Sequence, residues 1–399
     1  RTRILDRHLK ELFVEGVETP DGTKFGGKGF RSTWQEPIAA CGTALQLGKD
    51  VAAPMIRDLG LALSMGQTPL SIMSAQMGKS GSKMDGGHSD FGGRDLHIGD
   101  WSHGILPPTA PLPIASATAT GIALASSRKG DRRFILAPVG EGCSSSGEFW
   151  EAINFAGARG LPICYIIQNN QIALDTFSNK QSGAETFGDK GASVGLPAWS
   201  IDGSDPAIYY ASVSVARELA VSGCGGCIVH VETMRGCGHA HHHDDLYLGA
   251  ENGNPPGYVG EDLMEYWSKK EPIENHERLL RSIGVSSRLL KSIADEEEAS
   301  CAEARLAVES MKWPEPESVA IGTSKLTNAR THHQQIKDLE GIKPATSQSD
   351  IGPMKFEAAS NAWTFSRAIQ NAMVDIADNE GDNALFMGED MEVAGAFGL

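Results

Sequence analysis

The sequence predicts an α/β fold in which a parallel sheet is flanked by helices. Three apolar stretches, residues 134–139, 163–167 and 227–232, are continuous, as in strands that are buried on both faces. Segments with helical character separate them, and this alternation is typical of a parallel sheet. Ligands of such folds bind beyond the carboxyl ends of the strands.

The segments before the first strand predict helices and one long loop. Apolar residues recur at helical spacing from Ile4 to Phe13, and residues 35–47 have a similar character. Residues 77–113 are rich in Gly, Ser and Pro, and a loop of this length is usually functional or mobile. Residues 115–126 are small and apolar and predict a tightly packed helix.

The segments between the strands predict two further helices and a turn. Ser145 and Glu148 form a capping-box pattern, which predicts the start of a helix after the first strand. Residues 202–205 predict a turn, and residues 207–221 predict a helix that leads into the third strand.

The composition restricts the compartment and the kind of partner. The chain has 399 residues, of which 40% are hydrophobic, and its formal net charge of −16 argues against nucleic acid or an anionic membrane as partner. No apolar run is long enough to span a membrane, and no signal peptide is recognisable. Seven cysteines, mostly within apolar runs, fit a reducing compartment. We therefore expect a cytoplasmic protein, or a mitochondrial matrix protein in a eukaryote.

The most informative motif combines a Gly-acid-Gly turn with a pair of asparagines. Gly140, Glu141 and Gly142 follow the first apolar strand, and Asn169 and Asn170 end the second. This order brings one carboxylate and one carboxamide to neighbouring strand ends. Hard oxygen ligands of this kind suit a Mg²⁺ or Ca²⁺ ion that holds a diphosphate.

These motifs and the run ETMRGCGHAHHHDD at residues 232–245 together resemble the thiamine diphosphate-dependent 2-oxoacid dehydrogenases. The resemblance is to the alpha subunit of the decarboxylating first component and covers about residues 1–315. The run YWSKKEPI at residues 266–273 is most similar to the branched-chain members. The resemblance implies the thiamine diphosphate-binding fold and the oxidative decarboxylation of a 2-oxoacid. A branched-chain 2-oxoacid is favoured, and pyruvate or acetoin are the alternatives.

The resemblance also implies how the cofactor is held. Glu141, Asn170 and the backbone carbonyl of Ile172 correspond to the ligands of Mg²⁺, with Ca²⁺ as the alternative, whereas Asn169 has a structural role in the turn. Arg57 corresponds to an arginine that contacts the diphosphate.

Three further positions complete the cofactor site that the resemblance implies. Gly140 and Gly142 belong to the turn where the backbone approaches the diphosphate, next to the start of a helix. Leu112 corresponds to the apolar residue that supports the thiazolium ring in its bent conformation.

Two histidines are the candidate catalytic residues. His239 matches the active-site histidine of the family, which can donate a proton or a hydrogen bond to the substrate adduct. His103 is the second candidate, in the loop before the first strand. The chain departs from the family after His239, where Ala240 and three histidines at 241–243 replace the usual Ser or His, so the substrate choice stays open.

The end of the chain resembles the start of a beta subunit. A predicted helix over residues 361–379 is followed by LFMGEDMEVAGAFGL. The chain begins without a methionine and ends without a polar tail, so we expect a fragment of an alpha–beta fusion. In the family, the glutamate that activates the cofactor lies in the beta part. A beta portion or a second chain would therefore complete the site in an oligomer, and a lipoyl acyltransferase would accept the acyl group.

These observations predict four regions. Residues 1–260 would form the α/β domain that binds the metal and the diphosphate, and residues 261–316 the C-terminal helices of the alpha part. Residues 317–358 would be a linker, and residues 359–399 would begin a second, similar α/β domain of the pyrimidine-binding type.

Other functions compete for the same residues. Cys224, Cys227, Cys237 and His239 have a spacing that superficially fits zinc, but the cysteines would lie at opposite ends of a strand. Residues 79–83 (KSGSK) lack the complete phosphate-loop pattern. A transketolase-like enzyme could use the same metal motif, and a structural scaffold is the non-enzymatic alternative.

Overall fold

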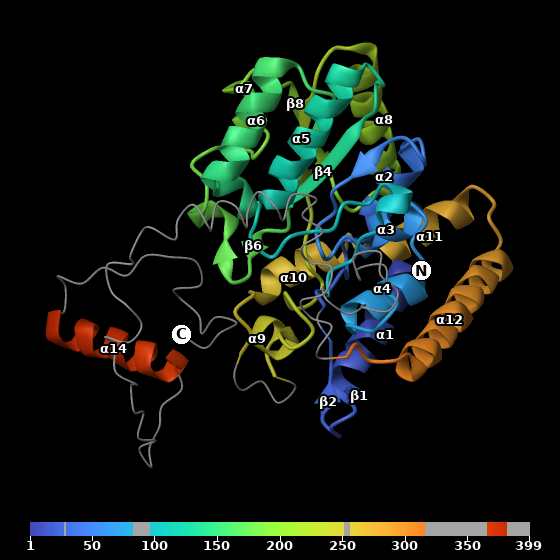
Figure 1. The fold of residues 1–399 in the computed structure, drawn as a ribbon, viewed down its shortest axis with the longest axis vertical. Helices are drawn as coiled ribbons and strands as arrows, with labels where there is room; N and C mark the ends of the chain where they lie inside the picture. The colour runs from blue at the N-terminus through green and yellow to red at the C-terminus, as the bar shows by residue number, and fades with distance from the viewer. Residues whose placement is uncertain (28, 83–95, 251–255, 316–364, 381–399) are drawn as a thin grey trace, which may run out of the picture. The chain divides into compact units, whose positions relative to one another are not determined.

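A five-stranded parallel sheet organises the molecule (Figure 1). Its strand order is β3-β4-β5-β9-β8, and every pair of neighbours is parallel. The strands are β3 (Val51–Ala52), β4 (Ile135–Gly140), β5 (Ile163–Asn169), β8 (Ala198–Asp202) and β9 (Cys227–Glu232). The predicted parallel α/β fold is confirmed.

The computed structural model describes residues 1–27, 29–82, 96–250, 256–315 and 365–380. The chain divides into two units, Arg1–Glu315 and Pro316–Leu399. The second unit contributes helix α14 (Phe365–Glu380), which corresponds to the helix predicted over residues 361–379. The predicted linker at 317–358 and the run LFMGEDMEVAGAFGL, with which the second α/β domain is expected to begin, lie outside the described residues. Within the described ranges, no helix is long and apolar enough to cross a membrane.

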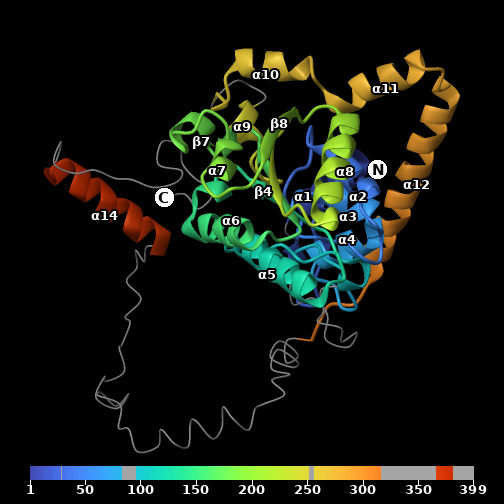
Figure 2. The same cartoon turned by 90° about the horizontal axis from the view of Figure 1, so that it is seen from above.

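Both faces of the sheet are buried, because its side chains alternate between two core clusters. In β4, Leu136 belongs to one cluster, whereas Ile135 and Ala137 belong to the other. Helices α5 (Ile114–Lys129) and α6 (Gly147–Arg159) supply the second cluster and lie along one side of the sheet (Figure 2). This two-sided burial explains the continuous apolar strands in the sequence.

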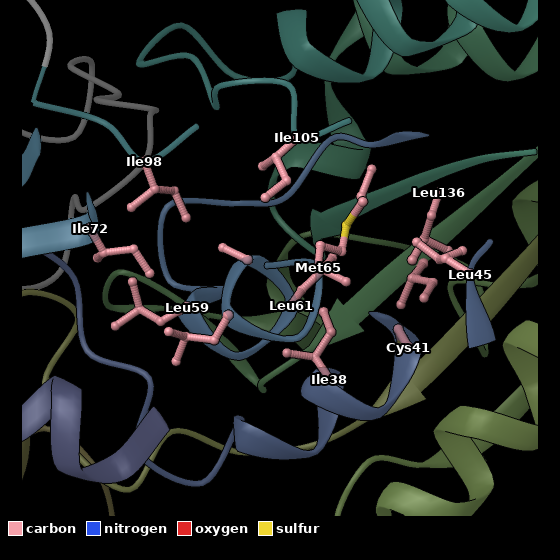
Figure 3. Packing of buried hydrophobic residues seen from close by; sticks show 14 of the residues in the cluster. Ile38, Cys41, Leu45, Leu59, Leu61, Met65, Ile72, Ile98, Ile105 and Leu136 are labelled. Carbon is pink, nitrogen blue, oxygen red and sulfur yellow. The ribbon is translucent and has the colours of Figure 1, made fainter. Parts of the chain in front are cut away.

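The other face carries the larger core. Figure 3 shows part of it, with Ile38, Leu59 and Leu136 converging from different elements. The helices that contribute are α1 (Thr2–Glu15), α2 (Ala39–Ala44), α3 (Leu59–Ser64), α4 (Pro69–Gln76), α8 (Pro206–Ser222) and α12 (Ser287–Ser310). The remaining helices of this unit include α7 (Asp189–Ala192), α9 (Asp244–Leu248), α10 (Glu261–Ser268) and α11 (Pro272–Ser282). Two small antiparallel hairpins complete the strands: β1 (Val17–Glu18) with β2 (Lys24–Phe25), and β6 (Ile172–Ala173) with β7 (Thr176–Phe177).

Local details differ from the sequence predictions. The capping box is wrong: the N-cap of α6 is Ser146 without a side-chain cap bond, and the hydroxyl of Ser145 donates to the carbonyl of Gln181 at 3.3 Å. The physical reason is that residues 143–145 form a 3₁₀ turn (η4), which moves the helix start past Ser145. The predicted helix at 35–47 is split into the 3₁₀ turn η1 (Glu36–Ile38) and α2.

Candidate functional site

The candidate site lies where three neighbouring strands end. Gly140 of β4 is in register with Gln168 of β5, and Asn169 of β5 is in register with Glu232 of β9. The backbone N–H of Glu141 donates to the carbonyl of Gln168 at 3.3 Å, so the turn after β4 begins beside the end of β5. The two halves of the sequence motif are therefore brought together at one edge of the sheet.

Glu141 is a buried carboxylate with one oxygen unused. Its side chain is 2% exposed, and its Oε1 atom has no hydrogen-bond partner among the residues that the structure describes. Burial raises the pKa of Glu141, while the backbone N–H groups of Glu141 and Asn170 and the charges of Arg235 and Arg57 oppose that rise. A buried acceptor of this kind can take a water molecule or a bound cation as its partner.

The two asparagines differ in their surroundings. The Nδ2 atom of Asn170 donates to Oε1 of Gln35 at 3.2 Å, but its Oδ1 atom is buried without a partner in the described part of the chain. Asn169 instead donates to both carboxylate oxygens of Glu232 at 3.1 Å and accepts from the backbone N–H of Gln171 at 3.1 Å. Asn169 therefore fixes the turn, and Asn170 presents a free carbonyl oxygen.

Several contacts hold the turn after β4 in place. The backbone N–H and the hydroxyl of Ser144 both donate to the carbonyl of Glu141, at 3.1 and 2.6 Å. The buried amine of Lys190 donates to the carbonyl of Ser144 at 2.6 Å. A Cβ atom added to Gly142 would lie 2.6 Å from Cβ of Ala173, so this position requires glycine for its close approach to the β6–β7 hairpin.

Two buried guanidinium groups lie beside Glu141. Burial and the charge of Arg235 lower the pKa of Arg57 to about 10. The Nη2 atom of Arg235 donates to the carbonyls of Ile172 at 3.2 Å and Leu174 at 2.7 Å. Within the described ranges, its Nε and Nη1 atoms have no partner. The carbonyl of Ile172 keeps its second lone pair. The site thus combines unused acceptors with unused, positively charged donors.

His239 contacts Arg57. Its Nδ1 atom lies 3.1 Å from Nη2 of Arg57, and its ring packs edge-on against Phe30 with centroids 5.0 Å apart. Burial, followed by the charges of Arg57 and Arg235, lowers the pKa of His239 well below its usual value. Both effects favour the neutral form of the His239 imidazole.

The structure does not bring His103 or Leu112 to these residues. The Nδ1 atom of His103 lies 2.9 Å from Oδ2 of Asp100 in its own 3₁₀ turn, η3 (Trp101–His103). Leu112 is 62% exposed and lies just before α5. The catalytic role of His103 and the supporting role of Leu112 stay predictions.

The cysteines do not gather into a metal centre. Cys224 is exposed, whereas Cys227, the first residue of β9, and Cys237, which follows the strand, are buried. In the part of the chain that the structure describes, no group of three or more His, Cys, Asp or Glu side chains could hold a metal ion. The Glu141 site has a different composition, with one acid, one amide and one backbone carbonyl.

The sequence did not single out several residues of this site. Arg235 lies inside the run 232–245, but an arginine that is 1% exposed has no local signature that separates it from a surface arginine. Gln35, Asp58 and Gln168 also line the site, and the first two reach it from outside the strand-end motifs. Only the tertiary fold reveals them.

Comparisons with known proteins agree with this architecture. The family model described as "Dehydrogenase E1 component" matches residues 31–317. A 2-oxoisovalerate dehydrogenase subunit alpha of Bacillus subtilis (strain 168) is 28% identical over 286 residues, which cover 71% of this chain and 82% of that relative.

Pyruvate dehydrogenase relatives match over a shorter stretch. The E1 component subunit alpha of Bacillus subtilis (strain 168) is 33% identical over 183 residues, which cover 46% of this chain and 45% of that relative. The corresponding subunit of Staphylococcus aureus (strain N315) is 34% identical over 180 residues, with 45% and 46% covered. The family match extends over most of the chain and includes every residue of the strand-end site. The chain therefore belongs to the dehydrogenase E1 component family, the thiamine diphosphate-dependent 2-oxoacid dehydrogenases that its motifs resemble.

Proposed function

We propose that the chain holds thiamine diphosphate through a divalent cation bound by Glu141, Asn170 and the carbonyl of Ile172. The observation that carries this proposal is the pair of buried oxygens without partners, Oε1 of Glu141 and Oδ1 of Asn170. Such oxygens suit Mg²⁺, with Ca²⁺ as the alternative, and diphosphate oxygens would complete the coordination.

The charge of the site supports an anionic ligand. Arg57 and Arg235 are both buried. The carboxylates of Asp58 and Glu141 act on Arg57, but two donor atoms of Arg235 are without a partner among the described residues. Buried charges without partners are costly. A diphosphate bound together with its cation would supply negative charge for the arginines and positive charge for the carboxylates. The unused Nε and Nη1 atoms of Arg235 fit the same ligand, because guanidinium donors bind phosphate oxygens well.

The reaction that we infer is the oxidative decarboxylation of a 2-oxoacid. When bound, thiamine diphosphate supplies the nucleophilic carbon and the electron sink for this chemistry. The chain orients the diphosphate end, and His239 offers an imidazole N–H to the substrate side. The active site is completed by a beta-type portion or a second chain in an oligomer, and the acyl group passes to a lipoyl acyltransferase.

A branched-chain 2-oxoacid is the substrate that we favour. The 2-oxoisovalerate dehydrogenase relative aligns over 71% of the chain, whereas the pyruvate dehydrogenase relatives align over less than half of it. Pyruvate is the second candidate, because those shorter matches have the higher identity.

The direct test is a substrate screen with the chain and its beta-type partner. We expect reduction of an artificial electron acceptor with 2-oxoisovalerate, dependent on thiamine diphosphate and Mg²⁺, at a higher kcat/KM than with pyruvate. Preference for pyruvate or acetoin would overturn the substrate assignment. Turnover of sugar phosphates without 2-oxoacid decarboxylation would instead favour the transketolase-like alternative.

A further inference from the structure

A row of buried amide side chains connects Asn170 with the carboxylate of Asp58. The Nδ2 atom of Asn170 donates to Oε1 of Gln35 at 3.2 Å, and Nε2 of Gln35 donates to Oε1 of Gln168 at 3.5 Å. The Nε2 atom of Gln168 then donates to Oδ1 of Asp58 at 2.9 Å. None of the four side chains is more than 5% exposed, so water does not compete for these bonds.

The row has one direction, and Asp58 sets it. Burial raises the pKa of Asp58 to about 6, so above that pH Asp58 is ionised and accepts hydrogen bonds but donates none. Its second oxygen, Oδ2, already accepts from the backbone N–H of Met55 at 2.8 Å. Gln168 must therefore turn its NH₂ group toward Asp58 and its Oε1 atom away from it.

The same constraint passes to the next amides. The Oε1 atom of Gln168 accepts from Gln35 and, at 3.5 Å, from the hydroxyl of Tyr209. Gln35 therefore presents its NH₂ group to Gln168 and its oxygen to Asn170. A reversed Asn170 would place its own oxygen against Oε1 of Gln35 and would point its NH₂ group into the site.

We propose that Asp58, Gln168 and Gln35 are positioning residues that fix the amide of Asn170 with its oxygen toward the divalent cation. This inference rests on the proposed function, because it assigns a role to Asn170 as a cation ligand. It deepens that function by naming the residues that make the ligand an oxygen rather than an NH₂ group. None of the three needs to touch the cation.

The first variant replaces Asp58, which sets the direction of the row. Asp58→Asn keeps the volume but allows the terminal group to donate, so the direction is no longer set. We expect Mn²⁺ to bind the 399-residue chain in the presence of thiamine diphosphate about tenfold more weakly, as measured by titration calorimetry. Gln35→Met interrupts the row in the middle and should have a similar effect, which keeps the test valid if Asp58→Asn does not fold.

A matched control lies next to the row. Glu36 is also a buried carboxylate, but it forms an ion pair with Arg3 and has no bond to the amides. Glu36→Gln makes the same chemical change and should leave Mn²⁺ affinity within about twofold of the original. Near-UV circular dichroism of the metal-free variants checks that the fold is intact.

A second background separates orientation from other effects. In Asn170→Asp, both side-chain oxygens can accept, so orientation no longer matters. Adding Asp58→Asn to that background should change Mn²⁺ affinity by less than about twofold. An equal loss in both backgrounds would overturn the positioning role, because the effect would then not pass through Asn170.

The failure of the inference can be distinguished from the failure of the proposed function. If Glu141→Ala leaves Mn²⁺ affinity unchanged, the cation site itself is wrong. If Glu141→Ala removes binding but Asp58→Asn and Gln35→Met do not weaken it, the site stands and the positioning row is wrong.

Discussion

The guanidinium Nη2 atom of Arg57 lies 3.1 Å from the Nδ1 atom of His239. Arginine has donors only, so Nδ1 of the imidazole must be the acceptor. The ring proton of His239 is then on Nε2. Arg57, which we assign to diphosphate binding, thus sets the tautomer of His239, which we assign to catalysis.

This contact predicts the protonation state of His239. We expect a neutral ring with its proton on Nε2 between about pH 6 and pH 8, because burial and two arginines lower the pKa of His239. Nitrogen-15 NMR of histidine-labelled protein can identify the tautomer, with His239→Gln to assign the signal. A charged ring, or a proton on Nδ1, would show that the contact does not form in solution.

Replacing Arg57 should affect two properties at once. Arg57→Met removes the donor to Nδ1 and one of the buried charges, so the pKa of His239 should rise and thiamine diphosphate should bind at least about tenfold more weakly. The same NMR titration and calorimetry measure both effects. Arg128→Met, at an exposed position of α5, is the control and should change neither. If Arg57→Met weakened thiamine diphosphate binding but left the NMR signal of His239 unchanged, Arg57 would bind the cofactor without setting the state of His239.

Acid stability should depend on His241. Burial lowers the pKa of His241 from 6.5 to about 4, and neither ring nitrogen has a partner. The unfolded chain therefore binds a proton more readily, so stability is complete above pH 6.5 and is lost as the pH falls toward 4, by about 3 kcal/mol in total. His241→Leu should reduce the pH dependence of the unfolding free energy in this window.

The neighbouring histidine provides the control for that experiment. His242 is exposed and affects the pH dependence through its neighbour His243, whose pKa is lowered by burial and by the charge of His242, so His242→Leu should change that dependence less than His241→Leu does. Urea unfolding at several pH values between about 4 and 7 measures both variants. If the unfolding free energy changed equally with pH in His241→Leu and in the unsubstituted chain, His241 would be solvated in the folded state.

Lys190 should support the turn that carries Glu141. Its amine donates to the carbonyl and the hydroxyl of Ser144, which in turn donates to the carbonyl of Glu141. Lys190→Met removes a charged hydrogen-bond donor and should lower the unfolding free energy by about 2 kcal/mol. Lys190→Arg keeps the charge, so its unfolding free energy should fall by less than that of Lys190→Met. If both variants unfold like the original protein, the contact between Lys190 and Ser144 does not contribute to stability.

Three of the five strands of the parallel sheet were predictable, and much of the site was not. Residues of β4, β5 and β9 are buried on both faces, so their apolar runs stand out, whereas β8 is a half-exposed edge strand with polar residues such as Ser200 and was missed. Glu141 and Asn170 follow strands directly, and the parallel order places them together.

Other contacts depend on residues that are distant in sequence. Gln35 reaches Asn170 from the N-terminal segment, and Asp58 reaches Gln168 from the start of α3. No local pattern marks an amide that will be buried beside another amide. The capping box at Ser145 failed for a related reason, because the turn after β4 is shaped by its contacts with Glu141, Lys190 and Gln181 rather than by the helix start alone.

Calorimetry of Glu141→Ala shows whether Glu141 binds the cation that we propose to hold thiamine diphosphate. Loss of one charged ligand in a buried site should weaken binding of the cofactor with Mg²⁺ by about 3 kcal/mol or more. Glu148→Gln, which alters an exposed carboxylate in the first turn of α6, should leave the affinity unchanged. If Glu141→Ala bound thiamine diphosphate and Mg²⁺ as tightly as the original protein, Glu141 would not be a ligand of the cation.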